Sequence, residues 1–403
     1  MPTYKLIELI DDVISGEWGQ DVEDETNGIK VIRTTNFSNT GKLDLDKEVV
    51  FRNIDKAKVA KKKLQLGDII IEKSGGSPDQ PVGRVVYFEE DELYLCNNFT
   101  SVLRPKKELV VPKFLLYVLF NLHRTRKVLK FQNKTTGIIN LKLEQYLNQT
   151  DVIIPSLEIQ KKIVLTLDQA YALIEKRQSQ ITALDELTQS LFLEMFGESK
   201  VGNEKFPKKY LQDIANVGSS KRVFVNELVD KGIPFFRGTE IGSLASGEEV
   251  TPELFITEEH YQALKETSGI PKIGDLLMPS ICPDGRIWIV KKDKPFYFKD
   301  GRVLWISFKD QSINTSYIQY ALKTKLIKDY LKIASGTTFA ELKIFSLKNV
   351  EIVIPPLEIQ NNFEEKLLSI NKGKERLKKS LLEMENLYNA LLQKAFKGEL
   401  FKE

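Results

Sequence analysis

Two long stretches of the chain repeat apolar residues at every third and fourth position, which is the spacing of one face of an α-helix. They begin near Leu157 and Leu357, each just after an Ile-Pro step that ends a strand-like alternation. At 1.5 Å per residue, roughly 38 residues give a helix of about 57 Å, more than one small domain needs. The apolar face is interrupted only at Arg177, Thr188 and Lys374, so we expect an antiparallel coiled coil. The alternative is an amphipathic helix that packs on its own domain.

A second pattern is an internal sequence repeat between segments 200 residues apart. Residues 152–160 read VIIPSLEIQ and residues 352–360 read IVIPPLEIQ, each at the start of one of the predicted helices. Further upstream, both copies carry an apolar strand entered through a Gly-Asp turn, at residues 67–71 and 274–278. The chain is therefore two copies of one module of ordinary domain size, and its period is too long for a solenoid of roughly 20 to 50 residues per repeat.

These patterns predict an α+β fold with two similar mixed α/β domains, separated by two long antiparallel coiled-coil helices with pseudo-twofold symmetry. The predicted boundaries are 1–154 for the first domain, 155–197 for the central helix, 198–354 for the second domain and 355–403 for the C-terminal helix. Symmetric readers suit a target that itself has two halves, and duplex DNA is such a target.

The charge of the chain is uneven, although its formal net charge is only +3. Residues 104–134 contain nine Lys or Arg residues and a single acid, Glu108. In the second copy, the equivalent stretch carries Lys323, Lys325, Lys328 and Lys332. A basic surface of this kind suits a nucleic acid, but a solvated helix face explains such a run equally well.

Cysteine usage and the absence of long apolar runs indicate the cellular compartment of the protein. Cys96 and Cys282 supply neither a disulfide framework nor a CxxC motif, so we expect two reduced thiols in the core. The N-terminus lacks the basic start and apolar stretch of a signal peptide, and nowhere do about 18 apolar residues follow one another. We therefore expect a cytoplasmic protein that does not interact with a membrane.

Candidate DNA-contacting residues lie in loops that occur in both copies. Arg can pair bidentately with guanine and Asn with adenine, while hydroxyls, lysines and glycine-flanked backbone suit phosphates. Turn chemistry alone would explain many of the same Gly, Ser, Thr and Asn residues. The candidates in the first copy are Arg33, Thr35, Asn36, Lys73, Ser74, Arg84, Arg124, Arg126, Lys134, Thr135 and Thr136. Those in the second copy are Arg237, Thr239, Ser280, Arg286, Thr337 and Thr338.

The doubled Ile-Pro-x-Leu-Glu-x-Gln motif resembles the specificity subunits of Type I restriction-modification systems, and the resemblance covers essentially the whole chain. It implies a non-catalytic DNA reader whose two target-recognition domains each read one half of a bipartite sequence. The helices would set the gap and dock two methyltransferase subunits, through which a restriction motor-nuclease subunit joins. The resemblance also implies that this chain carries no cofactor, and that S-adenosylmethionine, ATP and Mg²⁺ act in the partner subunits. The family commonly has Leu-Glu-Glu-Gln at the end of this motif, and here Ile159 and Ile359 occupy the third position of that segment, a change that the first turn of a helix tolerates.

Two rival functions are considered. One is a Mg²⁺-dependent nuclease, because Pro78-Asp79 and Pro283-Asp284 resemble the start of a PD-(D/E)xK site. No convincing acid-x-Lys follows on a strand, however, and Pro-Asp is a common turn dipeptide. The other is a coiled-coil scaffold without a role at nucleic acid, which explains the helices but not the duplicated basic loops. No phosphate-binding loop or amino-methyltransferase motif occurs in the sequence.

Overall fold

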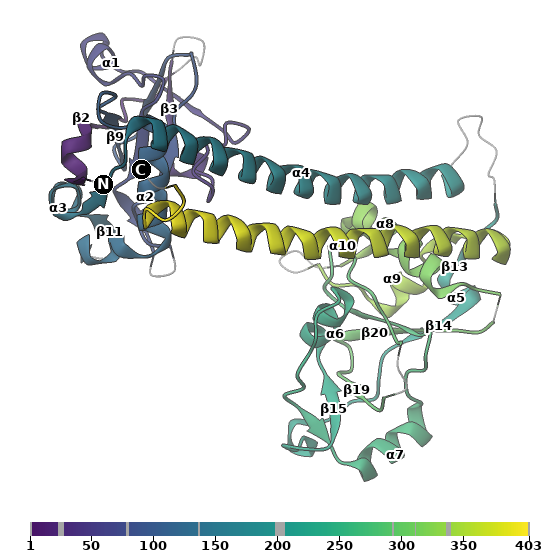
Figure 1. Ribbon diagram of the computed structural model, residues 1–403. Helices are drawn as coiled ribbons and strands as arrows, with labels where there is room; N and C mark the ends of the chain where they lie inside the picture. The colour runs from purple at the N-terminus through teal and green to yellow at the C-terminus, as the bar shows by residue number, and fades with distance from the viewer. Residues whose placement is uncertain are drawn as a thin grey trace. The chain divides into compact units, whose positions relative to one another are not determined.

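A computed structural model describes residues 2–22, 28–77, 80–135, 138–197, 206–291, 294–310, 312–335 and 340–401 (Figure 1). The chain divides into two compact units, unit 1 with residues Met1–Ser179 and Lys378–Glu403, and unit 2 with Gln180–Leu377. Each unit contains a globular module, part of the long helix α4 (Leu157–Phe196) and part of the long helix α10 (Leu357–Phe396). We call the globular parts module 1, which precedes α4, and module 2, which precedes α10. The division runs through both helices, and the domain boundaries expected from the sequence stay a prediction.

Module 1 is built on a four-stranded antiparallel sheet in the order β2-β9-β5-β7, with a three-stranded sheet β4-β3-β8 beside it in the fold. In the smaller sheet, β3 is antiparallel to β4 and parallel to β8. The strands of these sheets are β2 (Ile10–Ser15), β3 (Ile29–Ile32), β4 (Val50–Arg52), β5 (Ile69–Glu72), β7 (Val85–Tyr87), β8 (Tyr94–Cys96) and β9 (Thr100–Pro105). The remaining strands are β1 (Thr3–Lys5) paired with β12 (Asp151–Ile153), and a sheet of β10 (Gln132–Thr135), β11 (Ile138–Leu141) and β6 (Ser74–Gly76). The helices are α1 (Lys56–Lys62), α2 (Pro112–Arg124) and α3 (Leu143–Gln149), with 3-10 turns η1 (Leu6–Leu9), η3 (Thr34–Asn36) and η4 (Lys127–Phe131).

Module 2 repeats this topology. Its four-stranded sheet has the order β14-β20-β17-β18, its three-stranded sheet the order β16-β15-β19 with β15 parallel to β19, and β13 pairs with β21. The strands are β13 (Lys208–Tyr210), β14 (Ala215–Gly218), β15 (Ile233–Phe236), β16 (Phe255–Ile256), β17 (Leu276–Pro279), β18 (Trp288–Ile289), β19 (Tyr297–Phe298), β20 (Val303–Phe308) and β21 (Glu351–Val353). The helices are α5 (Leu211–Ile214), α6 (Gly238–Ala245), α7 (Glu258–Ser268), α8 (Thr315–Ile333) and α9 (Ile344–Lys348), with the 3-10 turn η5 (Val225–Glu227). The prediction of two similar α/β modules is confirmed.

The Gly-Asp turns that lead into β5 and β17 are built alike. Gly67 and Gly274 have φ of 95° and 91°, a left-handed conformation that glycine adopts without a Cβ clash. The following aspartates close the turns, because Asp68 accepts a hydrogen bond from the N–H of Gln65 and Asp275 from that of Lys272. A short sequence pattern thus fixes where the central strand of each module begins.

The two long helices start at the predicted residues and are 40 residues long each. In unit 1, Tyr171 packs on Tyr388 with ring centroids 5.7 Å apart. In unit 2, Asp185 binds Lys374 and Phe196 packs on Phe363 at 5.4 Å. A step of one residue forward along α4 moves its contact one residue back along α10. The two helices therefore pair in antiparallel fashion and keep one register. The predicted antiparallel pairing is confirmed (Figure 1).

The ends of the helices complete the cores of the modules. In unit 1, Leu392 and Ala395 of α10 are buried in the same cluster as Leu167 of α4 and Phe114 of α2. In unit 2, Phe196 of α4 is buried with Tyr317 of α8 and with the first turns of α10. Each module therefore buries part of its apolar surface against both long helices, and for module 1 one of these, α10, is encoded far from it in the sequence.

The repeated motif glutamine locks each long helix onto its module. Gln160 and Gln360 are both fully buried. Gln160 accepts a hydrogen bond from the N–H of Val111 (2.7 Å) and donates to the carbonyls of Leu109 (3.0 Å) and Pro155 (2.8 Å). In the second copy, Gln360 accepts from the N–H of Asn314 (2.9 Å) and donates to the carbonyls of Pro355 (2.7 Å) and Ser312 (3.5 Å). Val111 and Asn314 are the N-cap residues of α2 and α8, so the motif joins two helix starts in each unit.

Both cysteines are free, buried thiols, as expected. Burial raises the pKa of Cys96 to about 11 and that of Cys282 to about 12. Within the described ranges, no helix combines the length and the apolar character that a membrane span requires.

Candidate nucleic-acid interface

An arginine follows the parallel strand of the small sheet in each module, and both arginines sit in the same local structure. Arg33 after β3 and Arg237 after β15 are N-cap residues of short helices, η3 and α6. The N–H of Arg33 donates to Asn36 (3.0 Å), and the N–H of Arg237 donates to Glu240 (2.8 Å). Both guanidinium groups also reach glutamates farther along the chain, Glu48 and Glu253.

Asn36 is the candidate whose placement favours DNA contact least. Its side chain is fully buried, and its amide donates to the backbone carbonyls of Asp44, Lys47 and Glu48. The amide therefore holds the loop together. The neighbouring Thr35 is exposed. In unit 2 the corresponding acceptor is Glu240, where burial raises the pKa, but hydrogen bonds from Arg237 and backbone N–H groups outweigh it and leave the pKa below its usual value.

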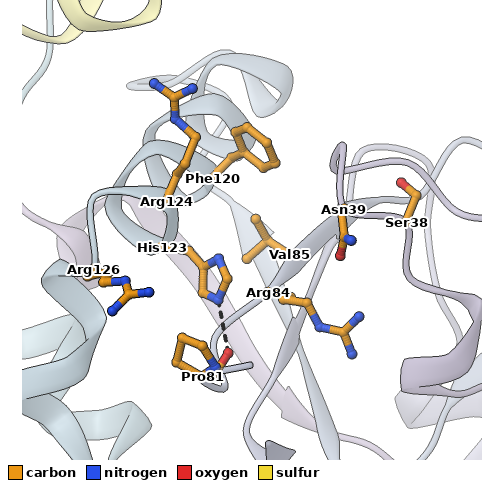
Figure 2. A pocket seen from close by; sticks show the side chains of 9 residues that line it. All are labelled: Ser38, Asn39, Pro81, Arg84, Val85, Phe120, His123, Arg124 and Arg126. Atoms are coloured by element: carbon orange, nitrogen blue, oxygen red, sulfur yellow. Dashed lines mark hydrogen bonds between the residues drawn. The ribbon is translucent and has the colours of Figure 1, made fainter. Parts of the chain in front are cut away.

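A cleft of about 260 Å³ in unit 1 brings three of the predicted arginines together (Figure 2). Its lining comprises Ser38, Asn39, Pro81, Arg84, Val85, Phe120, His123, Arg124 and Arg126. Figure 2 shows the ring of His123 between Arg84 and Arg126, with Nε2 at hydrogen-bonding distance (3.0 Å) from the carbonyl of Pro81. The guanidinium of Arg124 points away from this centre, and it donates to Asn389 of α10 within the same unit.

Arg84 is braced by a buried carboxylate. Its Nε and Nη2 donate to the two oxygens of Glu72 on β5, at 2.9 and 3.0 Å, and Nη2 also donates to the carbonyl of Thr34 (3.3 Å). The side chains of Glu72 and Arg84 are only 5% and 22% exposed. This bidentate pair ties the loop after β3 to the central sheet, so the arginine fork is largely occupied.

Arg126 adopts a left-handed backbone conformation, with φ of 58°. It is the only residue other than glycine with a positive φ in the parts of the chain that the structure describes. Such a conformation costs an L-residue roughly 1 to 2 kcal/mol, and glycine avoids that cost. An exposed arginine is thus held in a strained position at the rim of a cleft lined by cations.

Unit 2 has a larger cleft of about 650 Å³ between the equivalent loops. Its lining includes the predicted residues Arg237, Thr239, Ser280 and Arg286. It is mixed in charge, because four cations, Arg237, Arg286, Lys299 and Arg302, line it together with the carboxylates Glu240, Glu249 and Glu253. Arg286 is the counterpart of Arg84, since each follows a glycine with positive φ in the same loop. The structure therefore gathers candidates from separate loops into one cleft per unit.

The loop after β5 and its counterpart after β17 have less freedom than the sequence suggests. Ser74 donates to Asn140 (2.6 Å), and Ser280, which is nearly buried, donates to Glu341 (2.9 Å). Lys73 is half-buried and donates to Ser15 (3.3 Å), and its burial lowers its pKa. These side chains connect strands of their own module.

The remaining candidates lie on or near β10. Lys134 and Thr135 belong to β10, the edge strand of the sheet β10-β11-β6. Thr136, Thr337 and Thr338 lie outside the described residues. The assignment of all these residues to DNA contact stays a prediction.

The basic stretch of residues 104–134 serves two purposes. Arg104 binds Asp68 in the Gly-Asp turn (2.9 Å), and Lys113 binds Asp168 of α4 (3.1 Å), so these two cations are structural. Arg124, Arg126, Lys127 and Lys130 at the end of α2 and in η4 are exposed. In the second copy, hydrogen bonds from Lys325 and Lys332 lower the pKa of Asp329 to about 2. Arg126, Lys127 and Lys130 thus leave exposed positive charge just after α2 and in η4, and Arg126 lines the cleft of unit 1.

The carboxylates near Pro283-Asp284 take part in turn structure. Pro283 and Asp284 form a turn, and the carboxylate of Asp284 binds Nε of Arg286 at 2.6 Å. Pro78 and Asp79 are outside the described residues. Among the residues that are described, no group of three or more His, Cys, Asp or Glu side chains converges as a metal site would require.

Sequence reasoning missed several residues that line the clefts. Phe120 and His123 of α2 line the cleft of unit 1, and Lys299 and Arg302 line that of unit 2. None of them belongs to the loops that the internal sequence repeat identified. The basic stretch that encloses His123 was the available signal for the first cleft. The aromatic residues Phe114 and Tyr117 are buried in the core of unit 1, and Tyr320 packs partly buried against that of unit 2.

The chain matches the family described as "Type I restriction modification DNA specificity domain" twice, at residues 10–183 and 203–386. A putative type I restriction enzyme specificity subunit of Haemophilus influenzae is 29% identical over 72% of this chain and 71% of its own length. The specificity subunit of the type I restriction enzyme MjaIX of Methanocaldococcus jannaschii is 26% identical over 79% of this chain and 76% of its own length.

Solved structures share the fold over nearly the whole chain. A chain from a study of complex assembly and conformational transition in the type I R-M system has a TM-score of 0.62 at 17% identity, covering 99% of this chain and 98% of its own. The S subunit of a Type I restriction-modification system from M. genitalium has a TM-score of 0.53 at 16% identity, covering 98% of this chain and 96% of its own. With two family matches that span both modules, this chain belongs to the Type I restriction-modification DNA specificity family and is a specificity subunit with two target-recognition domains.

Proposed function

We propose that this chain is the non-catalytic DNA reader of a Type I restriction-modification complex, in which each module binds one half of a bipartite target. The observation that carries the proposal is the equivalence of the two clefts. Both lie between the loop after the parallel strand and the loop with the Gly-Arg step, and both are lined by arginines. Two readers of one fold with different linings suit a target whose halves differ in sequence.

The helices are proposed to set the unspecified gap between the two half-sites. Their pairing is rigid in each unit, because aromatic contacts and buried apolar residues hold it. Half-sites on one face of DNA are separated by about one helical turn, roughly 34 Å. We therefore expect a motif of about 3 to 5 specified base pairs, a gap of about 5 to 8, and a second specified part.

Sequencing of methylated bases tests this proposal. The full chain is expressed together with its methyltransferase in cells that lack other methylation, and the modified motif is determined. A two-part, asymmetric motif is expected. A continuous palindrome, or methylation that does not depend on this chain, would contradict the two-reader function.

The helices are also proposed to dock two methyltransferase subunits, which would bind S-adenosylmethionine, while ATP and Mg²⁺ would act in these and in a restriction subunit bound through them. Exposed leucines occur at corresponding positions of both helices, at Leu187 and Leu387, with 52% and 66% exposure. Contiguous exposed apolar surface marks interaction sites, and we propose that each of these leucines belongs to such a contact surface.

Replacing either leucine by glutamate tests the docking surface. We expect Leu187→Glu and Leu387→Glu each to remove one methyltransferase subunit from the purified complex, since a charge would be buried at the interface. The mass of the complex, measured by light scattering, reports this. The matched control Gln189→Glu adds the same charge at an exposed polar position and should leave two subunits bound. Retention of both subunits by the double leucine variant would rule out this surface.

A further inference from the structure

We propose that Arg286 reads a guanine in the half-site bound by module 2, and that Gly242 on α6 provides the space that positions its guanidinium. The inference rests on the DNA-reading function proposed above and deepens it, because it names one side chain and one base. It comes from three features of the cleft in unit 2, which are the fixed backbone under Arg286, the missing Cβ at Gly242 and the carboxylate of Asp284.

The backbone of Arg286 is fixed by the glycine before it. Gly285 has φ of 66°, and a Cβ at this position would lie 2.9 Å from Cγ of Lys323 and 3.2 Å from its carbonyl oxygen on α8. The loop therefore approaches α8 more closely than any other residue would permit. The side chain of Arg286 therefore starts from a loop that is held against α8, and a defined starting point is a requirement for a precise contact.

The guanidinium of Arg286 lies over Gly242. An alanine Cβ at Gly242 would be 2.8 Å from Nη1 and 3.4 Å from Cζ of Arg286. Gly242 is inside the helix α6, where alanine would be favoured by roughly 0.5 to 1 kcal/mol. A glycine that costs helix stability and makes room for one side chain indicates that the position of that side chain matters.

Asp284 holds one edge of the guanidinium and leaves the other edge available. The carboxylate binds Nε at 2.6 Å, and Arg286 is 42% exposed in the cleft. Its counterpart Arg84 instead has both Nε and Nη2 engaged by the nearly buried Glu72. For Arg286, the parts of module 2 that the structure describes provide no ion pair besides Asp284. Its terminal nitrogens can therefore form the parallel pair of hydrogen bonds that guanine O6 and N7 accept.

The surrounding charges favour a base over a phosphate. The cleft contains Glu240, Glu249 and Glu253, and Asp284 is bound to Arg286 itself. These carboxylates offset the charges of Arg237, Lys299 and Arg302 in the same cleft, so a phosphate is attracted less strongly there than to a purely basic lining, while the neutral edge of a base is little affected. The cleft of unit 1, whose lining contains three arginines and no acid, shows the opposite balance.

Selection of binding sites from randomised duplex DNA tests the inference with the full chain and its methyltransferase. The wild type should enrich a two-part motif. Arg286→Ala should lose the preference for one G·C pair in one half by about 10- to 100-fold, while all other positions keep theirs. Gly242→Ala should weaken the same position, and its melting temperature should not fall, because the clash involves only the end of a flexible side chain.

Gly373→Ala is the matched control, because this glycine also lies within a helix and a Cβ there would meet nothing within 4 Å. Its motif should equal that of the wild type. If Arg286→Ala weakens binding to every sequence by one factor and leaves the motif unchanged, Arg286 binds phosphate and the inference is wrong. An unchanged motif with unchanged affinity overturns it as well. Failure of the wild type to enrich any motif would instead reject the DNA-reading function itself.

Discussion

Gln160 and Gln360 illustrate how a conspicuous sequence motif can serve the fold. Both belong to the repeated motif, and their position in the first turn of each long helix resembles a family signature. Each side chain satisfies one backbone N–H and two carbonyls at the junction of two helices. Buried groups of this kind are costly to leave unpaired, which explains why the amide at this position recurs in both copies.

Replacing Gln160 by alanine should destabilise unit 1 by about 1 to 3 kcal/mol, because the N–H of Val111 and two carbonyls would lose a partner. Chemical denaturation of the full chain measures the change. Glu158→Gln serves as control in the same motif, since Glu158 is 77% exposed and forms an ion pair with the exposed Lys162. The control should change stability by less than about 0.5 kcal/mol. Equal midpoints for both variants would contradict the role of the amide.

Arg126 should show opposite effects on stability and on DNA binding. Arg126→Gly relieves the left-handed strain, so the free energy of unfolding should stay the same or rise by up to about 1 kcal/mol. DNA affinity should fall for all sequences, and the salt dependence of binding should decrease by about one ion. Melting curves and titrations at several salt concentrations measure the two effects.

Thr125→Gly is the control for Arg126, because Thr125 has an ordinary φ of −81° and gains no relief from glycine. It should lower stability and keep the salt dependence. If Arg126→Gly binds DNA like the wild type, the strained arginine has no role at phosphate.

The burial and the charge partners of single residues could not be predicted from the sequence. Arg84 and Arg286 occupy equivalent positions of the internal repeat. Glu72 nevertheless binds Arg84 in a buried ion pair, whereas Arg286 is exposed to the cleft. Module 2 has Met278 and Pro279 near the position of Glu72, a difference that has meaning only once the strands are paired. Asn36 similarly has the chemistry of a base reader, but the loop around it folds over its amide. Burial and charge partners depend on tertiary contacts, which a spacing pattern does not contain.

At the level of elements, the long helices were predictable because the apolar period, the Ile-Pro entry and the length all indicate the same structure. The register of their pairing was not predictable, since an apolar face can be shifted by one heptad without changing its pattern. The register depends on specific contacts, such as Tyr171 with Tyr388 in unit 1 and Asp185 with Lys374 in unit 2.

Matched insertions should lengthen the gap in the DNA motif, whereas a single insertion should not be tolerated. Between the contacts of Tyr171 and of Asp185, both helices advance by the same number of residues. One heptad inserted after Ser179 in α4 alone removes this match, so methylation should be lost. A second heptad after Lys379 in α10 should restore it, with both half-sites unchanged and a gap longer by at most about three base pairs, since seven residues add about 10.5 Å. An unchanged gap in the double variant would show that the helices do not determine it.

At the level of the whole molecule, the two compact units do not both coincide with one continuous segment of the sequence. Unit 1 needs residues from both ends of the chain, since Leu392 and Ala395 are buried with Phe114 and Leu167. The sequence boundaries assign the last helix to the end of the chain as a separate element. They could not indicate that part of it belongs to the first module, because no local pattern records the partner of an apolar face.

When module 1 is replaced by that of another family member, the exchanged residues should therefore include both segments of unit 1, and not only the segment that precedes α4. Exchanging residues 2–179 together with 378–401 should change one half of the methylated motif, leave the other half intact and preserve stability. Exchanging 1–151 alone should change the same half but lower the melting temperature, because a foreign core would meet native Leu392 and Ala395. Methylation sequencing and thermal melts of both chimaeras measure this, and changes in both halves would argue against independent modules.

The burial of Leu392, Ala395, Leu400 and Phe401 against module 1 has a consequence for biosynthesis. These residues are translated after both modules, so module 1 waits with an incomplete core until the second long helix has been made. A stop codon ahead of Leu392 would thus damage module 1, although the lesion lies after module 2 in the sequence.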